Sequence, residues 1–516
     1  MICETLAIEK TKHMNSEPLI LALDQGTSSS RAAIFDANGE MIASESVPLK
    51  VDYPRDGWVE QNPEEIWESQ VSAMKKVKER LTESQYKSVI CCGITNQRET
   101  TILWRRNDSK PCGPALVWQD GRTANICAEW KKDGLEKEWC HRTGLLLDPY
   151  FSASKISWLL QNESAASDAC NQSNLCFGTV ETWLLWNLTS EKNHFSDMSN
   201  ASRTLLMDIE NLSWEKSFCE NILLPEDSLP ELVPCRGDFG RIKEGLPFSG
   251  VPIQGILGDQ QAATFGQLCF QSGEAKCTYG TGAFLVVNTG DKIFRSKSGL
   301  LSTIGWTNSK GEPTYCLEGS LFNAGTVIQW FRDGLQIINN AKDVNILASQ
   351  VKSSEGLMCV PAFTGYGTPH WDPAARGLII GITRDTNRSH IARAGIEGIA
   401  LSVSTLLELA EEAMKIKLSV LAVDGGAAAS DLLLQAQADS IGINVRRADN
   451  LESTARGVAL LAGMESGLIQ NTDSFEDKSK KSSKVFTPKI SAEQRSKWRK
   501  KWEKAVERSL EWYEEN

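Results

Sequence analysis

The strongest constraint on the fold is a two-strand unit that occurs twice in the chain. Residues 19–23 are apolar, the polar segment 24–30 contains a glycine, and a second apolar run covers residues 31–35. A comparable unit recurs at residues 275–287, with Gly280-Thr281-Gly282 as its turn. Two apolar runs around a glycine-containing turn are typical of a β-hairpin. We therefore predict a degenerate internal repeat.

Strand and helix patterns alternate along the rest of the chain. Before the second hairpin they predict a helix at 66–81, a strand at 88–95 and a helix at 151–160. After it come a helix at 324–335, a loop-rich stretch at 361–376, a helix at 389–414 and a strand at 419–423. Such alternation predicts an α/β fold with helices covering the sheets.

The repeat and the length of 516 residues together predict two large domains. We place an N-terminal extension at residues 1–18, a first domain at 19–267 and a second at 268–516. The boundary lies near residues 266–271, just after a short helix for which Asp259 is the expected N-cap.

The stretch 477–516 is basic, and apolar side chains recur in it at helical spacing, namely Trp498, Trp502, Val506, Leu510 and Tyr513. We expect a terminal amphipathic helix that docks these side chains on the body of the protein. The alternative is a basic helix that binds another surface.

Charge and composition exclude several classes of function. The 55 Lys and Arg against 66 Asp and Glu give a net charge of −11, which argues against general binding of nucleic acid or anionic membranes. The uncharged stretch 357–371 contains two prolines, so we expect no membrane span. The first 18 residues carry three glutamates and no arginine, and the 14 cysteines form no CxxC motif. These features predict a cytoplasmic protein with reduced thiols.

Three glycine turns suggest a phosphate site. The turn Asp24-Gln25-Gly26-Thr27 offers backbone N–H groups and hydroxyls to phosphate oxygens, and its carboxylate suits a hydrated Mg²⁺. The second hairpin and Asp424-Gly425-Gly426 supply two further turns of this kind. We therefore expect two facing domains that hold one nucleotide between them.

Longer motifs carry a family resemblance. They are GWVEQ at 57–61, PEEIW at 63–67, GITNQRET at 93–100, VWQDGRT at 117–123, LDPYFSASK at 147–155, GDQQAATFGQL at 258–268 and YGTGAFLVVNTG at 279–290. Over nearly its whole length the chain resembles the FGGY carbohydrate kinases, of the actin, heat-shock-chaperone and sugar-kinase superfamily. The motifs GITNQRET and LDPYFS resemble those of the family branch that phosphorylates glycerol. The resemblance implies two ribonuclease-H-like (actin-like ATPase) domains with the catalytic cleft between them.

The resemblance also implies a polyol site. The corresponding substrate contacts are Arg98, Glu99, Trp118, Tyr150, Asp259, Gln260 and Phe284, with Asp259 as the catalytic base. A cation that donates and a carboxylate that accepts suit the hydroxyls of glycerol. Without the motif, Arg98-Glu99 would be an exposed ion pair, Asp259 a helix cap and the aromatic residues core.

The implied cofactors are ATP and Mg²⁺. The residues that correspond to nucleotide contacts are Thr27, Ser28, Ser29, Arg31, Thr281, Gly325, Gln329, Gly426 and Ser430, and Asp24 is the Mg²⁺ partner through water. The chain departs from the family pattern at Ser430, where an asparagine is usual, and at Gly121, where an arginine is common.

The expected activity is transfer of the γ-phosphoryl group of ATP to a terminal hydroxyl of glycerol, which gives sn-glycerol 3-phosphate and ADP. This reaction would serve glycerol catabolism and glycerolipid supply. We expect a homo-oligomer, a dimer or tetramer, with no nucleic-acid partner. Two alternatives stay open: a kinase for another small polyol or ketose, and a non-catalytic module whose conformation is driven by ATP.

Overall fold

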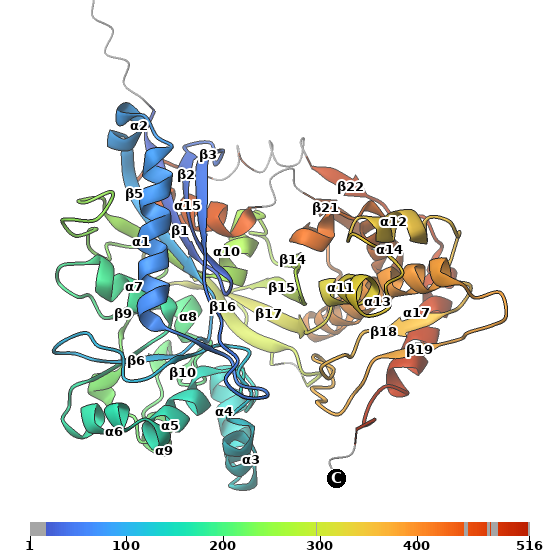
Figure 1. The fold of residues 1–516 in the computed structure, drawn as a ribbon, viewed down its shortest axis with the longest axis horizontal. Coiled ribbons are helices and arrows are strands. Elements are labelled where there is room, and N and C mark those ends of the chain that lie inside the picture. Colours follow the sequence, from blue (N-terminus) through green and yellow to red (C-terminus); the bar gives the residue numbers. More distant parts are fainter. Residues whose placement is uncertain (1–16, 296, 448–451, 472–474, 476–482, 514–516) are drawn as a thin grey trace, which may run out of the picture.

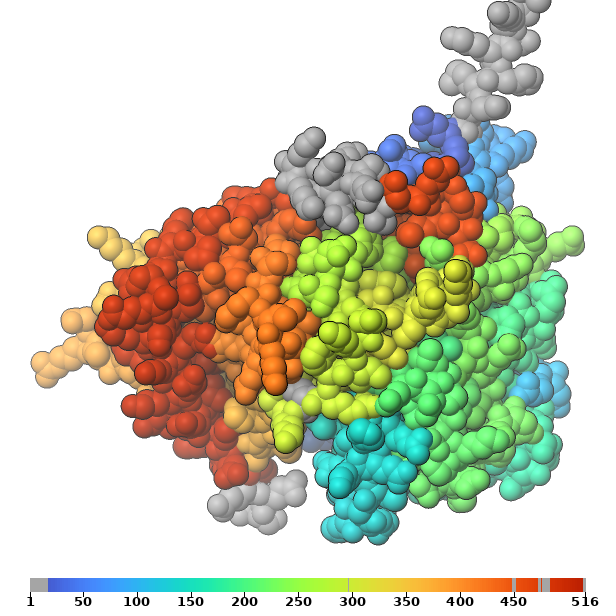
Figure 2. Space-filling model, turned by 180° about the vertical axis from the view of Figure 1, so that it is seen from behind, coloured from blue at the N-terminus to red at the C-terminus, as the bar shows by residue number. Residues whose placement is uncertain are grey.

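The computed structural model describes residues 17–295, 297–447, 452–471, 475 and 483–513. They form two lobes that lie side by side, each built around one mixed β-sheet (Figure 1). From behind, the yellow, orange and red second half of the chain packs along the green part of the first (Figure 2).

The sheet of the first lobe has the strand order β13-β5-β1-β2-β3. Its strands are β1 (Leu19–Gln25), β2 (Ser29–Asp36), β3 (Met41–Pro48), β5 (Val89–Asn96) and β13 (Ile253–Gly258). The hairpin β1-β2 and the strand β3 pair antiparallel, whereas β5 and β13 run parallel to β1.

The sheet of the second lobe repeats this arrangement. Its order is β16-β17-β15-β14-β20-β21-β22, with β14 (Glu274–Tyr279), β15 (Ala283–Gly290), β16 (Leu301–Thr307), β17 (Pro313–Leu321), β20 (Val420–Asp424), β21 (Asn444–Arg447) and β22 (Lys484–Phe486). Strands β17, β15, β14, β20 and β21 pair in the same directions as β3, β2, β1, β5 and β13. The predicted repeat is confirmed.

The first hairpin turn is shorter than predicted. Asp24 pairs with Arg31 and Gln25 with Ser30 in the ladder, so residues 26–29 lie outside it, and of these Ser29 already belongs to β2. The side chain of Gln25 is buried and accepts a hydrogen bond of 2.7 Å from the Ser30 hydroxyl, which extends the strand into the polar segment.

Helices cover both faces of the first sheet. On one face α1 (Pro63–Glu79) and α7 (Val180–Leu188) pack against Leu21 and Leu23. On the other face Ile20 and Ala22 pack against α10 (Asp259–Gly266) and α15 (Ser453–Glu465). Although α15 lies between β21 and β22 of the second lobe in sequence, it lies among the strands of the first (Figure 1).

In the second lobe α11 (Gly325–Asp333), α13 (Arg388–Met414), α14 (Asp431–Ile441) and α17 (Ala492–Glu507) enclose the main core. Trp502 and Val506 of α17 are buried in it, so the predicted docking of the terminal helix is confirmed. The helix ends at Glu507, however, and Tyr513 lies beyond it with 54% of its surface exposed. Tyr513 therefore does not belong to the helical stripe.

The remaining elements of the first lobe are β4 (Glu60–Gln61), α2 (Glu83–Lys87), β6 (Ile102–Arg105), β7 (Ala115–Leu116), α3 (Ala124–Lys132), α4 (Glu136–Thr143), α5 (Ser152–Asn162), α6 (Ser164–Asn171), β8 (Leu175–Gly178), β9 (Phe195–Asp197), α8 (Met198–Ala201), β10 (Met207–Asp208), β11 (Ser213–Trp214), α9 (Lys216–Asn221) and β12 (Glu231–Val233). The second lobe adds α12 (Asp343–Ala348), β18 (Met358–Val360) and β19 (Leu378–Ile380). Within the described ranges, no helix has the length and apolar character needed to cross a bilayer.

Candidate active site

Most of the predicted polyol residues come from strand ends that meet where the two lobes join. Arg98 and Glu99 follow β5, and Asp259 follows β13. Because β1, β5 and β13 are parallel, their carboxyl ends lie at one edge of the sheet, where ligands of open α/β sheets bind. Phe284 is contributed by β15 of the second lobe.

Asp259 is not the N-cap of α10. The cap is Gly258, and Asp259 is the first residue of the helix. Its Oδ1 accepts a hydrogen bond of 2.7 Å from the backbone N–H of Gln260 and lies 3.3 Å from Nε of Arg98. The predicted cap is therefore wrong, and the Asp259 carboxylate is directed to the buried arginine.

Arg98 and Glu99 are both 2% exposed, so they do not form a solvated surface pair. Two groups of Arg98 donate to Glu318 of β17, Nη1 at 2.6 Å to Oε2 and Nη2 at 2.8 Å to Oε1. Nη2 also donates to the Tyr150 hydroxyl at 3.3 Å, and Nη1 to Gln261 at 3.2 Å. The guanidinium is thus held in one orientation by both lobes.

The Glu99 carboxylate is held by a second arginine. Nε of Arg203 donates to Oε1 of Glu99 at 2.7 Å, and Nη2 of Arg203 donates to Oε1 of Glu318 at 3.0 Å. Burial alone would raise the pKa of Glu318, but Arg203 and Arg98 lower it to about 2. Glu318 is therefore ionised at neutral pH.

The electrostatics of Asp259 differ from those of Glu318. Burial raises the pKa of Asp259, and the opposing effects of Arg98 and Lys276 do not cancel the shift. A carboxylate with increased proton affinity is a suitable proton acceptor.

The aromatic side chains lie close together at this edge. The ring of Trp118 is 5.7 Å from that of Tyr150 and 5.8 Å from that of Phe284, both edge-on. Trp118 and Phe284 are only half-buried, so they are not plain core residues. Nε1 of Trp118 donates to the Thr27 hydroxyl at 3.0 Å and so connects the aromatic cluster to the first hairpin turn.

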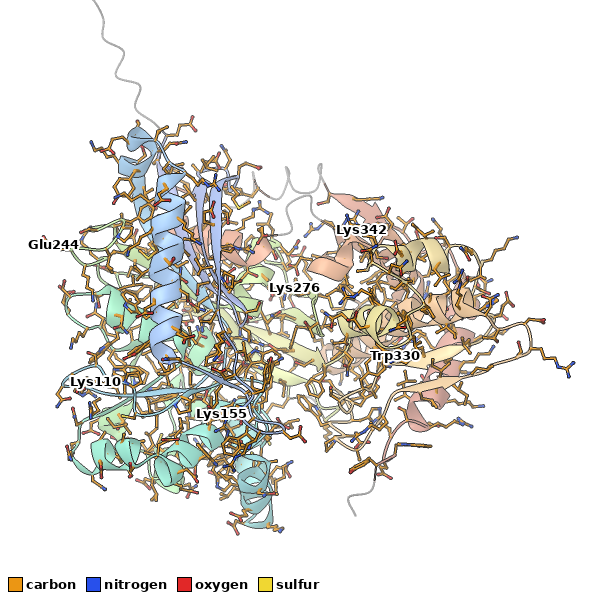
Figure 3. The ribbon with its side chains drawn as sticks, in the orientation of Figure 1. Lys110, Lys155, Glu244, Lys276, Trp330 and Lys342 are labelled. Atoms are coloured by element: carbon orange, nitrogen blue, oxygen red, sulfur yellow. The ribbon has the colours of Figure 1, made fainter. Side chains whose placement is uncertain are left out.

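Gln260 is oriented by a lysine from the second lobe. Nζ of Lys276, on β14, donates to Oε1 of Gln260 at 2.7 Å and to the Thr278 hydroxyl at 3.0 Å. Lys276 lies between the lobes in Figure 3. Because the lysine occupies the carbonyl oxygen of Gln260, the amide NH₂ is the end available to a ligand.

On the predicted phosphate side, Thr27, Ser28 and Ser29 form or adjoin the first turn. Arg31 instead pairs with Glu452 at the start of α15, and its Nε donates to Ser46 at 3.1 Å. In this structure the guanidinium of Arg31 therefore interacts with side chains of the protein itself. Burial raises the pKa of Asp24 to about 6. The positive charge of Arg31 opposes this upward shift, and the carboxylate of Asp259 adds to it.

Asp24 fits the role of a partner of hydrated Mg²⁺. Two mutually repelling carboxylates, Asp24 and Asp259, face the same region, and a cation would relieve that repulsion. No group of three or more His, Cys, Asp or Glu residues suited to a metal is present in the part of the chain that the structure describes. One carboxylate with water and phosphate oxygens is the usual arrangement for Mg²⁺.

The predicted nucleotide residues of the second lobe share one cavity of about 650 Å³. Thr281, Gly325, Gln329, Gly426 and Ser430 all line it. Gly425 allows this shape because its φ of 86° suits glycine, and an added Cβ would lie 2.5 Å from the carbonyl oxygen of Tyr279.

Ser430 has a specific neighbour in this cavity. Its hydroxyl donates to Oδ1 of Asn345 on α12, another lining residue. An amide is thus present beside the position where the family usually has asparagine. Ser430 also caps α14 by accepting from the N–H of Leu433 at 3.1 Å.

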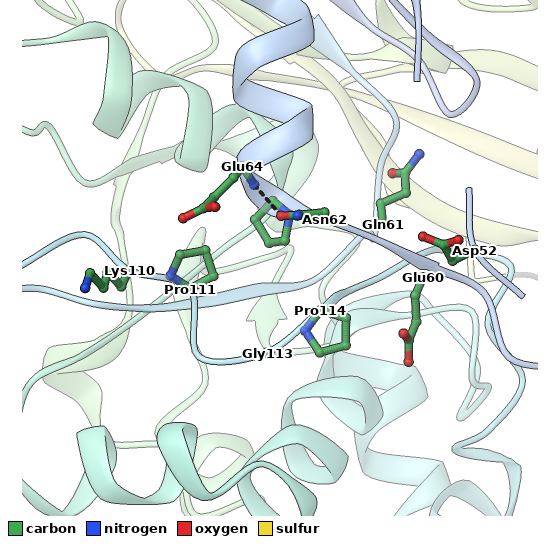
Figure 4. A pocket seen from close by; sticks show the side chains of 10 residues that line it. Asp52, Glu60, Gln61, Asn62, Glu64, Lys110, Pro111, Gly113 and Pro114 are labelled. Carbon is green, nitrogen blue, oxygen red and sulfur yellow. Dashed lines mark hydrogen bonds between the residues drawn. The ribbon is translucent and has the colours of Figure 1, made fainter. Parts of the chain in front are cut away.

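A second cavity, of about 460 Å³, lies outside this region at the start of α1 (Figure 4). Its lining includes Asp52, Glu60, Glu64 and Lys110. Asn62 caps α1 there by accepting from the N–H of Glu64 at 2.9 Å. None of the predicted site residues lines this cavity.

Three residues of the site escaped the sequence-based prediction, namely Arg203, Glu318 and Lys276. Each is a single charge in an otherwise uncharged run, as in YCLEGSLF around Glu318. Lys276 lies in the predicted second hairpin, and Glu318 lies in the largely apolar segment that forms β17. That pattern was the available signal, because a charge in a buried strand requires a partner.

Family comparisons agree with this architecture. The N-terminal domain of the FGGY family of carbohydrate kinases matches residues 19–266, and its C-terminal domain matches residues 275–466. The chain belongs to the FGGY family of carbohydrate kinases, enzymes of the two-domain, actin-like ATPase fold.

Curated relatives define the branch. A glycerol kinase of Caldanaerobacter subterraneus subsp. tengcongensis is 46% identical over 496 residues, 96% of this chain and 99% of the relative. A glycerol kinase of Carboxydothermus hydrogenoformans is 45% identical over 497 residues, with the same coverage. Within the family the chain falls among the glycerol kinases.

Solved structures of carbohydrate kinases are similar to this chain over nearly its whole length. A crystal structure of Plasmodium falciparum glycerol kinase with ADP has a TM-score of 0.89 and 36% identity, covering 96% of this chain and 98% of that chain. A gluconate kinase from Lactobacillus acidophilus has a TM-score of 0.82 at 21% identity, covering 95% and 97%, and shares the fold.

Proposed function

We propose that the chain transfers the γ-phosphoryl group of ATP to a terminal hydroxyl of glycerol, giving sn-glycerol 3-phosphate and ADP. The observation that carries the proposal is the buried Arg98-Glu99 pair, which lies beside Asp259 and a half-buried aromatic cluster. Charged donors and acceptors suit hydroxyls, and aromatic faces suit the carbon chain.

Glu99 and Tyr150 are the groups best able to bind the hydroxyls. Glu99 uses Oε1 for its contacts with the two arginines, which leaves Oε2 for a substrate hydroxyl. The Tyr150 hydroxyl accepts from Arg98 and keeps its own proton for donation. Arg98 already contacts Glu318, Gln261, Tyr150 and Asp259. Its main role is therefore to fix the geometry of the pocket and to balance the negative charge of the carboxylates.

Asp259 would accept the proton of the attacking hydroxyl. Its Oδ1 is engaged by Gln260, and Oδ2 remains for the substrate. The raised pKa of Asp259 favours proton acceptance in the transition state. Since phosphoryl transfer passes through a loose transition state, positioning of the hydroxyl by the same carboxylate contributes as well.

ATP would bind with its adenosine in the 650 Å³ cavity and its phosphates near the two hairpin turns. Thr27 and Thr281 would donate to phosphate oxygens from opposite lobes. Asp24 would hold Mg²⁺ through water, and the bound ion would neutralise phosphate charge. Nζ of Lys276, held by Gln260, would add a hydrogen-bond donor to this region.

The test is an ADP-release assay with purified protein over glycerol, other small polyols and ketoses. Glycerol should give the highest kcat/KM, and Tyr150→Phe should lower it about 5- to 10-fold through loss of one hydrogen bond. Preference for a ketose would support a different kinase activity. ADP release that does not respond to any polyol would indicate an ATP-driven module instead.

A further inference from the structure

We infer that Arg203 and Glu318 are positioning residues for the polyol pocket, and that the second lobe completes this pocket through Glu318. Neither residue belongs to the substrate contacts that the family motifs imply. The inference rests on the proposed function, because it concerns how the glycerol-binding pair is held.

Glu318 is fully buried on β17 of the second lobe, yet its partners belong to the first. Both of its oxygens are used, Oε2 by Arg98 and Oε1 by Arg98 and Arg203. A bidentate carboxylate fixes both the plane and the direction of a guanidinium. Glu318 therefore decides where Arg98 directs its other contacts, which include those with Tyr150 and Asp259.

Arg203 transfers this constraint to Glu99. It is fully buried and follows α8, and its fork joins Glu99 to Glu318. Its guanidinium lies 5.7 Å from the ring of Tyr150 and 5.3 Å from that of Phe151. Its Nη1 has no hydrogen-bond partner among the described residues, so the two carboxylates fix its orientation.

The four side chains form a closed ring, Arg98-Glu318-Arg203-Glu99, with two positive and two negative charges. Buried ion pairs contribute little net stability, since desolvation offsets their attraction. A ring of this kind is therefore better explained by the geometry that it imposes. The ring fixes the position of Oε1 of Glu99. Because both oxygens belong to one rigid carboxylate, the direction of Oε2, the oxygen that faces the substrate, is fixed as well.

The decisive variant is Arg203→Lys, which keeps the charge but cannot bridge two carboxylates with a planar fork. The KM for glycerol should rise at least tenfold, whereas the KM for ATP should stay within twofold of wild type. Arg142→Lys is the matched control, because Arg142 also bridges two carboxylates, Asp208 and Glu215, but is half-exposed outside the ring. It should leave both KM values unchanged.

A double variant, Arg203→Met with Glu318→Gln, keeps the ring neutral and guards against loss of folding in the single variant. It too should raise the KM for glycerol at least tenfold, and glycerol should not raise its Tm, whereas glycerol should raise the Tm of wild type. A glycerol KM within twofold of wild type in either folded variant would overturn the inference. Equal increases in both KM values would also overturn it, because they indicate a general structural role.

The wild-type protein separates this result from the proposed function. If wild type does not phosphorylate glycerol, the proposed function fails, whatever the variants do. If wild type does so and Arg203→Lys retains its glycerol KM, only the positioning role fails.

Discussion

Asp259 is the residue on which the reaction most depends. We expect Asp259→Asn to lower kcat by about 10²- to 10⁴-fold, because the amide cannot accept the hydroxyl proton. Since Gly258 is the N-cap, the substitution removes no capping hydrogen bond of the side chain. The measurements are kcat, Tm and the affinities for glycerol and ATP. A folded variant with turnover within about threefold of wild type would show that Asp259 is not the base.

His194 provides a pH-dependent prediction about stability. Burial lowers the pKa of His194 to about 4, although Nε2–H donates to the carbonyl of Phe177 at 2.8 Å. An unfolded histidine titrates near pH 6.5. Because the folded pKa is the lower one, the neutral ring stabilises the fold above pH 6.5, and this contribution of about 2–3 kcal/mol is lost as the pH falls to 4.

The measurement is urea denaturation of wild type and His194→Gln between pH 7 and 4. Gln keeps a donor for Phe177 but does not titrate, so the difference between the two free energies of unfolding should narrow or reverse toward pH 4. Other titrating groups cancel in the difference. Parallel curves over the whole range would contradict the assignment.

The sequence predicted the site residues unevenly. Arg98, Glu99, Tyr150 and Asp259 lie together as their motifs suggest, because motif and strand end coincide. Arg203 and Glu318 were missed because they lie 104 and 219 positions from Glu99 (203 − 99 and 318 − 99), and only the folded chain brings them together. Their side-chain pairing depends on how the two lobes meet, which no local pattern encodes.

At the scale of elements, the crossing of α10 and α15 is unusually close. A Cβ at Gly457 would collide with the carbonyl oxygen of Ala262, and one at Gly266 with that of Ser453. We expect Gly457→Ala to destabilise the protein by about 1–3 kcal/mol or more, since backbone atoms must move apart. Gly121→Ala is the control, because its Cβ would meet only a carbonyl oxygen at 3.5 Å.

Thermal denaturation of both variants checks this expectation. Gly121→Ala should melt near the wild-type temperature, and Gly457→Ala should melt several degrees lower. Equal melting temperatures for Gly457→Ala and wild type would mean that the two helices can separate at little cost.

The sequence predicted individual elements well and their packing poorly. The helix predicted at 389–414 is α13 (Arg388–Met414), and the strand predicted at 419–423 is β20 (Val420–Asp424), because hydrophobic periodicity is local. Nothing in that periodicity indicates that α15 packs on the first sheet. The predicted boundary at 266–271 stays a prediction, and the second range contains a helix that belongs spatially to the first lobe.

At the scale of the whole molecule, the two lobes should close on substrate. Thr27 and Thr281 lie on the turns of equivalent hairpins, and a triphosphate bound by both would draw the lobes together. Small-angle scattering with glycerol and a non-hydrolysable ATP analogue should show a smaller radius of gyration than the free protein. An unchanged radius, together with unchanged protease sensitivity, would argue against closure.

The position of α15 has a consequence for how the protein is made. The face of the first sheet that carries Ile20, Ala22 and Phe35 is covered by Val458 and Leu461 of α15. At ribosomal rates of about 5–20 residues per second, the roughly 200 residues between α10 and the end of α15 take about 10–40 s to synthesise. During that interval only α10 of the two covering helices has been made, so the part of this apolar face that α15 covers stays exposed on the nascent chain. A chaperone would therefore be needed while the first lobe waits for α15.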